Sequence, residues 1–372
     1  MNVPKLRFKE FNDEWKYEPL SNYVERIITK NKDNISSLVL TISAQSGLVD
    51  QTRFFNKNVS SNNLAGYYLL NKGDFAYNKS YSNGYPWGAI KRLNKYDKGV
   101  VSSLYICFKP NKKINSNYLE QYFETNKWYH QMSEVSVEGA RNHGLLNIAV
   151  GDFFSTEHFI PTLDEQKKIS KFLSLLDKKI ELQSKKIEDL KLFKLYIRNK
   201  IFSGIKTKDK IINTLNYEQP NRYIVKSEDY LNDENLIPVL TANKAFILGY
   251  CNENDYYNKG DVIIFDDFTM DSKYVNFNFK IKSSAIKLLT QKNNNNLKYI
   301  FECLQALNLE STEHKRHYIS IVQEIEIPVP DITVQNKIAN LMFMYDKKIK
   351  LESDNYNKLI ELKKGLMQSM FV

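Results

Sequence analysis

Residues 160–202 read IPTLDEQKKISKFLSLLDKKIELQSKKIEDLKLFKLYIRNKIF, and residues 329–371 read VPDITVQNKIANLMFMYDKKIKLESDNYNKLIELKKGLMQSMF. A shift of 169 positions aligns the two stretches without a gap, so that Asp177 falls on Asp346 and the run DKKI is identical in both. A long stretch that occurs once at mid-chain and again near the C-terminus indicates that one structural unit is present twice.

Both copies carry the signals of a helix start. Each opens with a proline after an apolar residue, and a capping residue follows, Thr162 in the first copy and Asp331 in the second. Proline disfavours the helical conformation in the residue before it, so an extended segment is expected to end there and a long helix to begin. Glu165 stands three residues after Thr162, which fits a capping box.

Apolar residues follow a heptad pattern along both predicted helices. Steps that alternate between three and four residues, taken from Leu173, meet seven apolar residues in nine places in each copy, and the polar exceptions fall at matching places. An apolar seam this narrow requires a partner helix. The predicted seam consists of Leu173, Leu176, Ile180, Gln183, Ile187, Leu190, Ile349, Glu352, Tyr356 and Leu359.

Each long helix is expected to pair with the other. The termini of a compact domain tend to lie close together, so the second helix should begin near the end of the first and run back along it. The prediction is an antiparallel coiled coil with a pseudo-two-fold internal repeat. The alternative is an amphipathic helix packed on a globular core, which is commoner for a single helix, but two matched copies favour the pair.

Mixed strand and helix signals fill the segments outside the helices. LVLT at 38–41 matches PVLT at 238–241, and the two NKGD runs, at 71–74 and 258–261, are each followed by strand-like residues. The predicted fold is α+β, with two mixed α/β domains separated by the two long helices. The predicted boundaries are 1–158 for the first domain, 159–204 for the central helix, 205–328 for the second domain and 329–372 for the C-terminal helix.

The composition is that of a folded protein without membrane or secretion signals. Hydrophobic residues make up 42% of the 372 residues, which supports packed cores. No apolar run is long enough to span a bilayer, and the start, MNVPKLRFKEF, lacks the apolar centre of a signal peptide, so a soluble, cytoplasmic protein is expected. Cys107, Cys251 and Cys303 are far apart, which argues against a zinc site or a disulfide framework.

The net charge of +10 is distributed unevenly. Residues 1–155 carry +6 and residues 156–205 carry +4, whereas residues 206–328 carry −2 and residues 329–372 carry +2. A basic chain suits a polyanion such as nucleic acid without requiring one. In the second domain, any contact with nucleic acid therefore needs a local basic patch.

Four predicted loops carry side chains suited to reading bases. They are KSYSNGYPWG at 79–88 and GARNHG at 139–144 in the first domain, and DDFTMDSKY at 266–274 and EHKRHY at 313–318 in the second. Arg and Lys suit guanine edges and phosphates, and Asn suits adenine. Taken singly, each residue also fits an ordinary solvated loop. The predicted DNA-contacting residues are Lys79, Tyr81, Asn83, Tyr85, Arg141, Asn142, His143, Thr269, Lys273, Lys315, Arg316 and His317.

Signatures of catalysis are missing from the sequence. It contains no GxxxxGK[ST] phosphate loop, no GxGxxG after a strand, and no acidic or Asn residue followed by Pro-Pro-aromatic. Pro330-Asp331 with the later Glu361 and Lys363 has the spelling of a divalent-metal nuclease site. However, Asp331 caps a helix, and residues two apart on a helix point in different directions. No catalytic residue, cofactor or metal ligand is predicted.

Over its whole length the sequence resembles the specificity subunit of type I restriction-modification systems. The resemblance rests on LRFKEFNDEWKYEPLSNYVERI near the start, on NKGDFAYNKSYSNGYPWGAI and GVVSSLYICFKP, and on the two helices with IP…EQKKI…LDKKI and VP…VQNKI…YDKKI. In that family, two target-recognition domains lie at opposite ends of an antiparallel helical pair, and each reads half of a split DNA site. KIINTLNYEQPNRYIV at 210–225 departs from the first opening and contains no equivalent of EWKYEPL.

The resemblance implies a non-catalytic scaffold. Its expected partners are double-stranded DNA, two methyltransferase subunits that carry S-adenosylmethionine, and motor-nuclease restriction subunits. Two other classes stay open: a DNA-cleaving or DNA-modifying enzyme with an unrecognised active site, and a coiled-coil protein-binding adaptor without DNA binding. Activity of the chain alone would indicate the enzyme, and absence of salt-dependent DNA binding by the assembled complex would indicate the adaptor.

Overall fold

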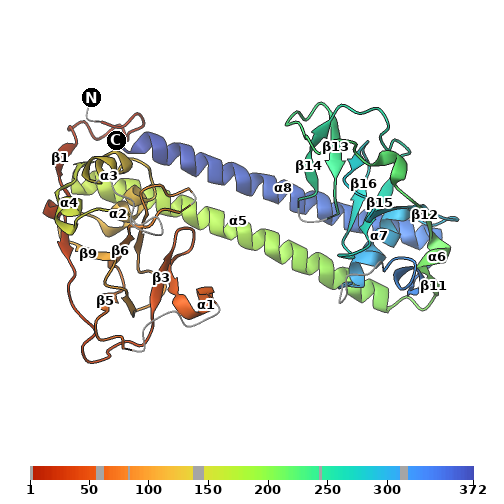
Figure 1. Cartoon of the computed structure of the whole chain (residues 1–372), viewed down its shortest axis with the longest axis horizontal. Coiled ribbons are helices and arrows are strands. Elements are labelled where there is room, and N and C mark those ends of the chain that lie inside the picture. The colour runs from red at the N-terminus through yellow and green to blue at the C-terminus, as the bar shows by residue number, and fades with distance from the viewer. Residues whose placement is uncertain (1–2, 56–62, 83, 137–145, 243–244, 311–316) are drawn as a thin grey trace. The chain divides into compact units, whose positions relative to one another are not determined.

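A computed structural model gives the structure of the protein and describes residues 3–55, 63–82, 84–136, 146–242, 245–310 and 317–372. The chain divides into two compact units (Figure 1). Unit 1 comprises Met1–Gln183 together with Asn355–Val372, and unit 2 comprises Ser184–Asp354. Each of the two long helices therefore contributes one segment to unit 1 and one to unit 2.

Unit 1 combines short strands with short helices and parts of the long ones. Its strands are β1 (Lys16–Pro19), β2 (Val24–Arg26), β3 (Leu40–Ser43), β4 (Gly47–Asp50), β5 (Tyr68–Asn71), β6 (Phe75–Asn78), β7 (Ala89–Arg92), β8 (Lys98–Val101), β9 (Ile106–Pro110) and β10 (Glu157–Ile160). Its helices are η1 (Leu20–Asn22), α1 (Gln51–Phe55), α2 (Ser116–Phe123), α3 (Tyr129–Val135), α4 (Val150–Ser155), the first part of α5 (Leu163–Ser203) and the last part of α8 (Ile332–Met370).

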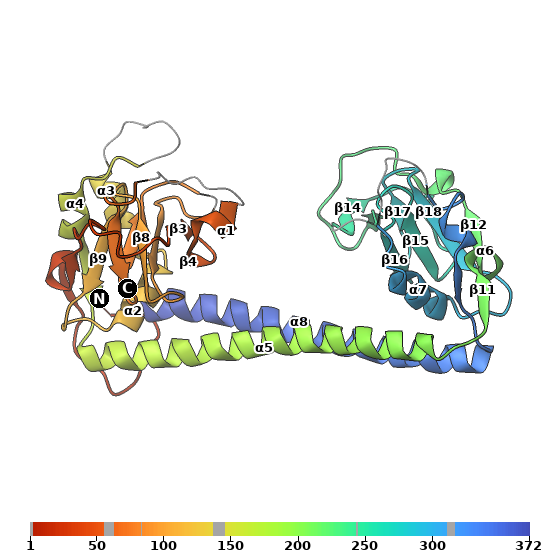
Figure 2. The same ribbon diagram turned by 90° about the horizontal axis from the view of Figure 1, so that it is seen from below.

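Antiparallel pairing organises the strands of unit 1, of which Figure 2 labels β3, β4, β8 and β9. A four-stranded sheet has the order β2-β9-β6-β7, while β3 pairs with β4, β5 with β8, and β1 with β10. The β1–β10 pair places Lys16 opposite Ile160 and so joins the opening of the module to the residues that lead into α5. Gly73, in the first NKGD run, has a φ of +95°, which glycine adopts without strain at this turn into β6.

An aromatic-rich core joins the sheet of unit 1 to its helices. Phe75 and Phe108 from the sheet stack with their ring centroids 5.3 Å apart, and Tyr118 of α2 contacts Phe371, the residue after α8, with ring centroids 5.3 Å apart. Leu173 of α5 is buried in the same cluster. Burial of each such side chain stabilises the fold by about 1.5–3 kcal/mol, so this core fixes α2 between the sheet and the long helices.

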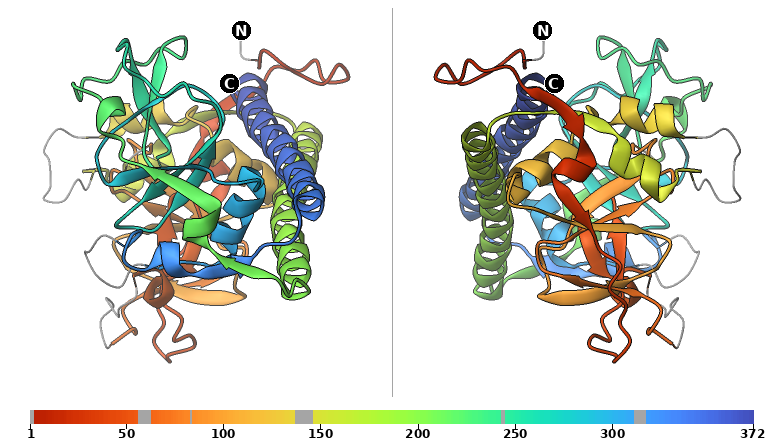
Figure 3. Two further views of the ribbon diagram at one scale, coloured as in Figure 1. Left: turned by 90° about the vertical axis from the view of Figure 1, so that its right-hand side faces the viewer. Right: turned by 90° about the vertical axis from the view of Figure 1, so that its left-hand side faces the viewer.

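The N-terminal segment of unit 1 lies against the ends of α5 and α8 (Figure 3). The amide of Leu6 donates to the carbonyl of Ser369 at 2.9 Å. The guanidinium of Arg7 forms two 2.8 Å hydrogen bonds with the carboxylate of Glu165, which is 0% exposed. The hydrogen bond that the Arg7 guanidinium donates to Glu165 raises the pKa of Arg7. Glu165, which the sequence suggested for a capping box, thus anchors the chain terminus.

Unit 2 has the same kinds of element. Its strands are β11 (Lys208–Lys210), β12 (Leu215–Glu218), β13 (Ile237–Leu240), β14 (Ile247–Cys251), β15 (Val262–Asp266), β16 (Ser272–Val275), β17 (Lys280–Ile281), β18 (Ile286–Gln291) and β19 (Glu326–Pro328). Its helices are α6 (Ile211–Thr214), η3 (Asn221–Tyr223), α7 (Leu297–Ala306), η4 (Val322–Glu324), the last part of α5 and the first part of α8.

The strands of unit 2 repeat the topology of unit 1. The sheet order β12-β18-β15-β16 corresponds to β2-β9-β6-β7, and β11 pairs with β19 as β1 pairs with β10. The NKGD runs precede β6 and β15, which are equivalent strands. The opening of the second module, which the sequence left without a counterpart, is therefore supplied by β11 and β12.

The same hydrogen bonds join each long helix to a short helix of its own unit. The side-chain carbonyl of Gln166 accepts from the amide of Asn115 at 2.7 Å, and that of Gln335 accepts from the amide of Asn296 at 2.9 Å. Both glutamines also donate to the proline that leads into their helix, at 2.9 Å. Asn115 caps α2 and Asn296 caps α7, so one side chain positions a helix start in each unit.

Ion pairs define the direction of α5 and α8 in unit 2. Lys194 of α5 pairs with Asp346 of α8 at 2.7 Å, and Lys186, which precedes it, pairs with Glu352, which follows Asp346, at 2.5 Å. From the first pair to the second, the residue number decreases along α5 and increases along α8, so the two segments run antiparallel.

An equivalent ion pair joins the same helices in unit 1. Asp177 of α5 contacts Lys363 of α8 at 2.5 Å. The shift of 169 positions relates Asp177 to Asp346 and Lys194 to Lys363. Both units therefore contain the same Asp–Lys pair, with the aspartate on α5 in unit 1 and on α8 in unit 2. The predicted antiparallel arrangement and internal repeat are confirmed.

The predicted seam residues are shielded from solvent, whereas residues next to them on the helices are exposed. Leu173 is 0% exposed and Ile180 and Ile187 are each 9% exposed, whereas Leu175 and Leu182 are 60% and 58% exposed. This contrast is what a narrow helix–helix seam produces. The other predicted seam residues are all buried or half-buried: Leu176, Gln183, Leu190, Ile349, Glu352, Tyr356 and Leu359. No helix in the described ranges is long and apolar enough to cross a bilayer.

Candidate nucleic-acid interface

Lys79 joins the start of the first predicted loop to a segment that follows the second. Its carbonyl accepts a hydrogen bond from the amide of Leu146 at 2.8 Å, and its ammonium donates to the carbonyl of Ile148 at 2.9 Å. Lys79 begins the loop that follows β6, and residues 146–148 come soon after the GARNHG run at 139–144. The structure therefore brings together chain segments that border both loops.

Three of the side chains predicted to contact DNA in this domain are described. Tyr81 is 62% exposed. Tyr85 is half-buried, with the ammonium of Lys91 at 5.3 Å from its ring centre, and burial raises the pKa of its hydroxyl. Lys79 is half-buried. The others lie outside the described residues: Asn83, Arg141, Asn142 and His143.

Gly88 fixes the end of the 79–88 loop. A Cβ atom at this position would lie 2.2 Å from the carbonyl oxygen of Asn78, and the φ of Gly88 is +79°. The hydroxyl of the buried Tyr77 donates to the carbonyl of Trp87 at 2.7 Å. The loop therefore returns directly onto the strand from which it starts, and only glycine allows that approach.

Asp266 shapes the loop that follows β15 in unit 2. One of its carboxylate oxygens accepts from the amides of Phe268 and Thr269, at 2.9 and 3.0 Å. Its amide donates to the carbonyl of Asp271 at 2.9 Å, which closes the turn. Met270 has a positive φ of 59° within this turn. A carboxylate that binds its own backbone is a common stabiliser of such loops.

Asp267 connects this loop to the second predicted loop of the domain. Its carboxylate accepts from the amides of His317 and Tyr318, at 2.9 and 2.8 Å, and lies 3.6 Å from the ammonium of Lys287. Asp267 and Lys287 are 2% and 1% exposed. The end of the EHKRHY run at 313–318 is thereby held against the DDFTMDSKY run through residues 317 and 318.

The predicted side chains of the second domain differ in exposure. Thr269 is exposed in the turn, and Lys273 is half-buried on β16. His317 is 5% exposed and would have to leave its place to reach a base. Lys315 and Arg316 lie outside the described residues.

Sequence reasoning missed the residues that support the loops. Asp266, Asp267, Lys287 and Gly88 had no predicted role. Two adjacent acidic residues at the end of a buried strand are a usable signal for a side chain that binds loop backbone. The contact between Asp267 and His317 joins residues fifty positions apart, which local pattern does not predict.

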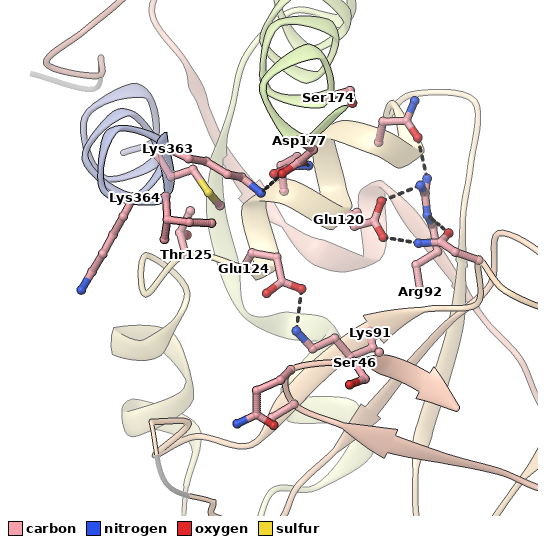
Figure 4. Close-up of a pocket in the computed structure, with 18 of the residues that line it drawn as sticks. Ser46, Lys91, Arg92, Glu120, Glu124, Thr125, Ser174, Asp177, Lys363 and Lys364 are labelled. Atoms are coloured by element: carbon pink, nitrogen blue, oxygen red, sulfur yellow. Dashed lines mark hydrogen bonds and ion pairs between the residues drawn. The ribbon is translucent and has the colours of Figure 1, made fainter. Parts of the chain in front are cut away.

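A polar pocket of unit 1 lies among β7, α2, α5 and α8 (Figure 4). Lys91 of β7 pairs with Glu124 at 2.6 Å, and Arg92 pairs with Glu120 at 2.5 Å. The Asp177–Lys363 pair lines the same pocket. Because these charges are matched, the pocket side chains tie the sheet and helices together.

Neither a metal cluster nor a reactive thiol is found in the described ranges. No group of three or more His, Cys, Asp or Glu side chains there could hold a metal ion. The three cysteines are free and buried, and burial raises the pKa of the Cys107 and Cys303 thiols to about 12. A thiol with such a pKa is unionised near neutral pH and a poor nucleophile.

Two units of one sheet topology, each with segments of the same paired helices, define a tandem-module protein. Residues 201–362 match the family model described as Type I restriction modification DNA specificity domain. The family resemblance drawn from the sequence is thereby confirmed for this part of the chain.

A curated relative supports the same family. The chain is 44% identical over 140 residues to the type I restriction enzyme EcoR124I/EcoR124II specificity subunit of Escherichia coli. The match covers 34% of this chain and 34% of that relative, so the chain matches about a third of the relative's length.

Two solved structures share the fold over nearly the whole chain. One is the crystal structure of the S subunit of a type I restriction-modification system from M. genitalium, with a TM-score of 0.60, 15% identity, and coverage of 100% of this chain and 99% of that one. The other, from a study of complex assembly and conformational transition of the type I R-M system, has a TM-score of 0.58, 15% identity, and coverage of 98% and 99%. The predicted α+β fold with a repeated two-domain layout is confirmed.

Proposed function

We propose that this chain is the non-catalytic DNA sequence-specificity subunit of a type I restriction-modification complex. Its first domain reads one half of a bipartite site in double-stranded DNA, and its second domain reads the other half. The observation that carries the proposal is the specificity-domain match over residues 201–362 together with a second unit of the same topology. Two recognition modules imply a split site.

The proposed recognition domains are residues 1–158 and 205–328, with spacer helices at 159–204 and 329–372. Phosphate contacts set the position of each domain on the duplex, and loop side chains read base edges in the major groove. The exposure of Tyr81 and Thr269 in the predicted loops supports this role. Arg141, Asn142, Lys315 and Arg316 remain the proposed reading residues with the most suitable chemistry.

Exposed apolar residues at equivalent places on the long helices support docking of two like partners. Leu175 and Met344 are 60% and 66% exposed, and Leu182 and Leu351 are 58% and 59% exposed. The shift of 169 positions relates the members of each pair. The two members on each helix are seven residues apart and so lie on one face of it, and exposed apolar side chains grouped on one face mark protein contact sites. We assign these positions to two methyltransferase subunits, which motor-nuclease restriction subunits would join.

S-adenosylmethionine is assigned to the methyltransferase subunits and not to this chain. The sequence contains no glycine-rich nucleotide loop and no pocket signature for an amino group about to be methylated. The cytoplasm is the proposed location, because the substrate is cellular DNA.

Methylome mapping tests the proposal. The chain would be co-expressed with its methyltransferase subunits, and genomic DNA from cells with and without the chain would be examined for methylated adenine. The expected result is a split methylated motif that is present only with the chain. Methylation that does not depend on the chain would contradict the proposal.

Two further assays address the alternatives. The purified chain alone, incubated with duplex DNA, Mg²⁺ and S-adenosylmethionine, is expected neither to cleave nor to methylate DNA, and activity would favour the enzyme. The assembled complex is expected to bind duplex DNA with an affinity that falls as salt rises. Absence of such binding would favour the adaptor.

A further inference from the structure

We infer that Lys79 and Asp267 are positioning residues that each tie the border of the second recognition loop to the start of the first within one module. The inference rests on the proposed function. Lys79 is the first residue after β6, and Asp267 is the first residue after β15. These are equivalent strands, so the two residues occupy the same place in the two copies of the module.

In unit 1 the bridge is made by a cation. Lys79 uses both its backbone and its side chain, with the 2.8 Å bond from Leu146 to its carbonyl and the 2.9 Å bond from its ammonium to Ile148. Its side chain helps to line a small hollow with Cys107 and Val150. The ammonium is therefore directed to a backbone carbonyl of the module.

In unit 2 the bridge is made by an anion. The carboxylate of Asp267 accepts from two consecutive amides, those of His317 and Tyr318. Lys287 lies 3.6 Å away and compensates the buried charge. The neighbouring Asp266 meanwhile binds the amides of the first loop. The two adjacent carboxylates thus fix one loop each.

The opposite charges of the two bridging side chains decide between two roles, contact with DNA phosphate and positioning of the loops. A residue that neutralises phosphate has to be basic, and Asp267 is acidic and buried. What the two positions share is the bond to the chain that leaves the second loop. Lys79, although a cation, is accordingly assigned to positioning instead of to DNA contact.

The test in unit 1 uses Lys79→Met in the full chain assembled with methyltransferase subunits. The variant keeps the stem and loses the donor to Ile148. Methylation of sites with one altered base in the half-site read by the first domain is expected to rise about tenfold relative to the intact site, the size of one lost base contact. The half-site read by the second domain should be unchanged. Lys72→Met is the matched control, since Lys72 is exposed and lies outside the loops.

Salt dependence and rescue separate positioning from direct contact. If Lys79 touched a phosphate, Lys79→Met would lower the slope of log affinity against log salt by about 1 and keep base preference, which would overturn the inference. The expected result is an unchanged slope with relaxed preference. Lys79→Arg, which keeps a donor, should restore preference. A uniform fall in methylation at all sites would show a merely structural role and would also overturn it.

The test in unit 2 uses two variants, one that keeps the hydrogen-bond acceptor of Asp267 and one that removes it together with its ion-pair partner. Asp267→Asn keeps an acceptor oxygen for both amides and is expected to retain the motif. Asp267→Ala combined with Lys287→Met removes both members of the buried ion pair, so that no uncompensated charge remains, and should relax only the second half-site. Asp255→Ala, at an exposed residue, is the control.

The outcomes distinguish the inference from the proposed function. A native complex that yields no split motif would refute the proposed function. A native complex with a split motif, and bridge variants that read it unaltered while folding normally by circular dichroism, would refute the inference alone.

Discussion

His158 of β10 illustrates how residues distant in sequence can set the burial and the pKa of a single side chain. It is 3% exposed, and its ring nitrogens Nδ1 and Nε2 lie 2.8 Å from the Tyr122 hydroxyl and 2.9 Å from the Thr156 hydroxyl. Burial lowers the pKa of the ring to about 3. His130, which is exposed, is not distinguishable from His158 by sequence context. The burial comes from α2, more than thirty positions away, and so could not be predicted locally.

This histidine predicts how stability depends on pH. The folded state holds the ring neutral while the unfolded state takes up a proton below its usual pKa of 6.5, so stability falls as pH drops from about 6.5 towards 3. Between pH 7 and pH 5 the loss from this group is about 2 kcal/mol. Urea unfolding of the native chain and of His158→Gln at both pH values should show a smaller loss in the variant. An equal loss in both, or the same reduction in the control His130→Gln, would contradict the assignment.

At the scale of elements, local patterns predicted the long helices and missed the start of the second module. The helices were predictable because their heptads, prolines and caps are contiguous in sequence. β11 and β12 were not, because these short strands are defined by pairing with β19 and β18, far along the chain. The bonds between segments that border the predicted loops, such as Lys79 to Ile148, were also out of reach, since they join distant residues.

Repeat-equivalent lysines should differ in their contribution to stability. Lys194 contacts Glu302, whose side chain is 1% exposed, as well as Asp346, whereas Lys363 contacts Asp177, whose side chain is 40% exposed. Lys194→Met leaves a buried carboxylate that the more distant Arg198 and Lys298, at 3.6 and 4.0 Å, only partly compensate, so it should cost about 2 kcal/mol.

Lys363→Met should cost less than about 1 kcal/mol, because water solvates the remaining carboxylate. Urea unfolding of the two variants gives the comparison, with Lys185→Met at an exposed place on α5 as control. Equal losses for Lys194→Met and Lys363→Met would show that the burial of Glu302 does not set the energetics.

At the scale of the whole molecule, the repeat makes the two long helices the parts of the chain that both modules share. Unit 1 takes the start of α5 and the end of α8, and unit 2 takes the remainder. In the proposed function, the lengths of these helices set the distance between the half-sites that the modules read. A change in helix length that preserves the seam is therefore the direct test of the division of labour between helices and modules.

A paired deletion of residues 180–186 from α5 and 354–360 from α8 removes one heptad from each helix. It preserves the three-and-four spacing of the seam and both equivalent ion pairs, Asp177–Lys363 and Lys194–Asp346. Each helix becomes about 10 Å shorter, so the half-sites in the methylated motif should move closer by about three base pairs, with the bases of each half-site unchanged. Deletion from α5 alone breaks the register and should abolish methylation. If the paired deletion yields a folded, active complex whose motif keeps its original spacing, the helices do not set the distance.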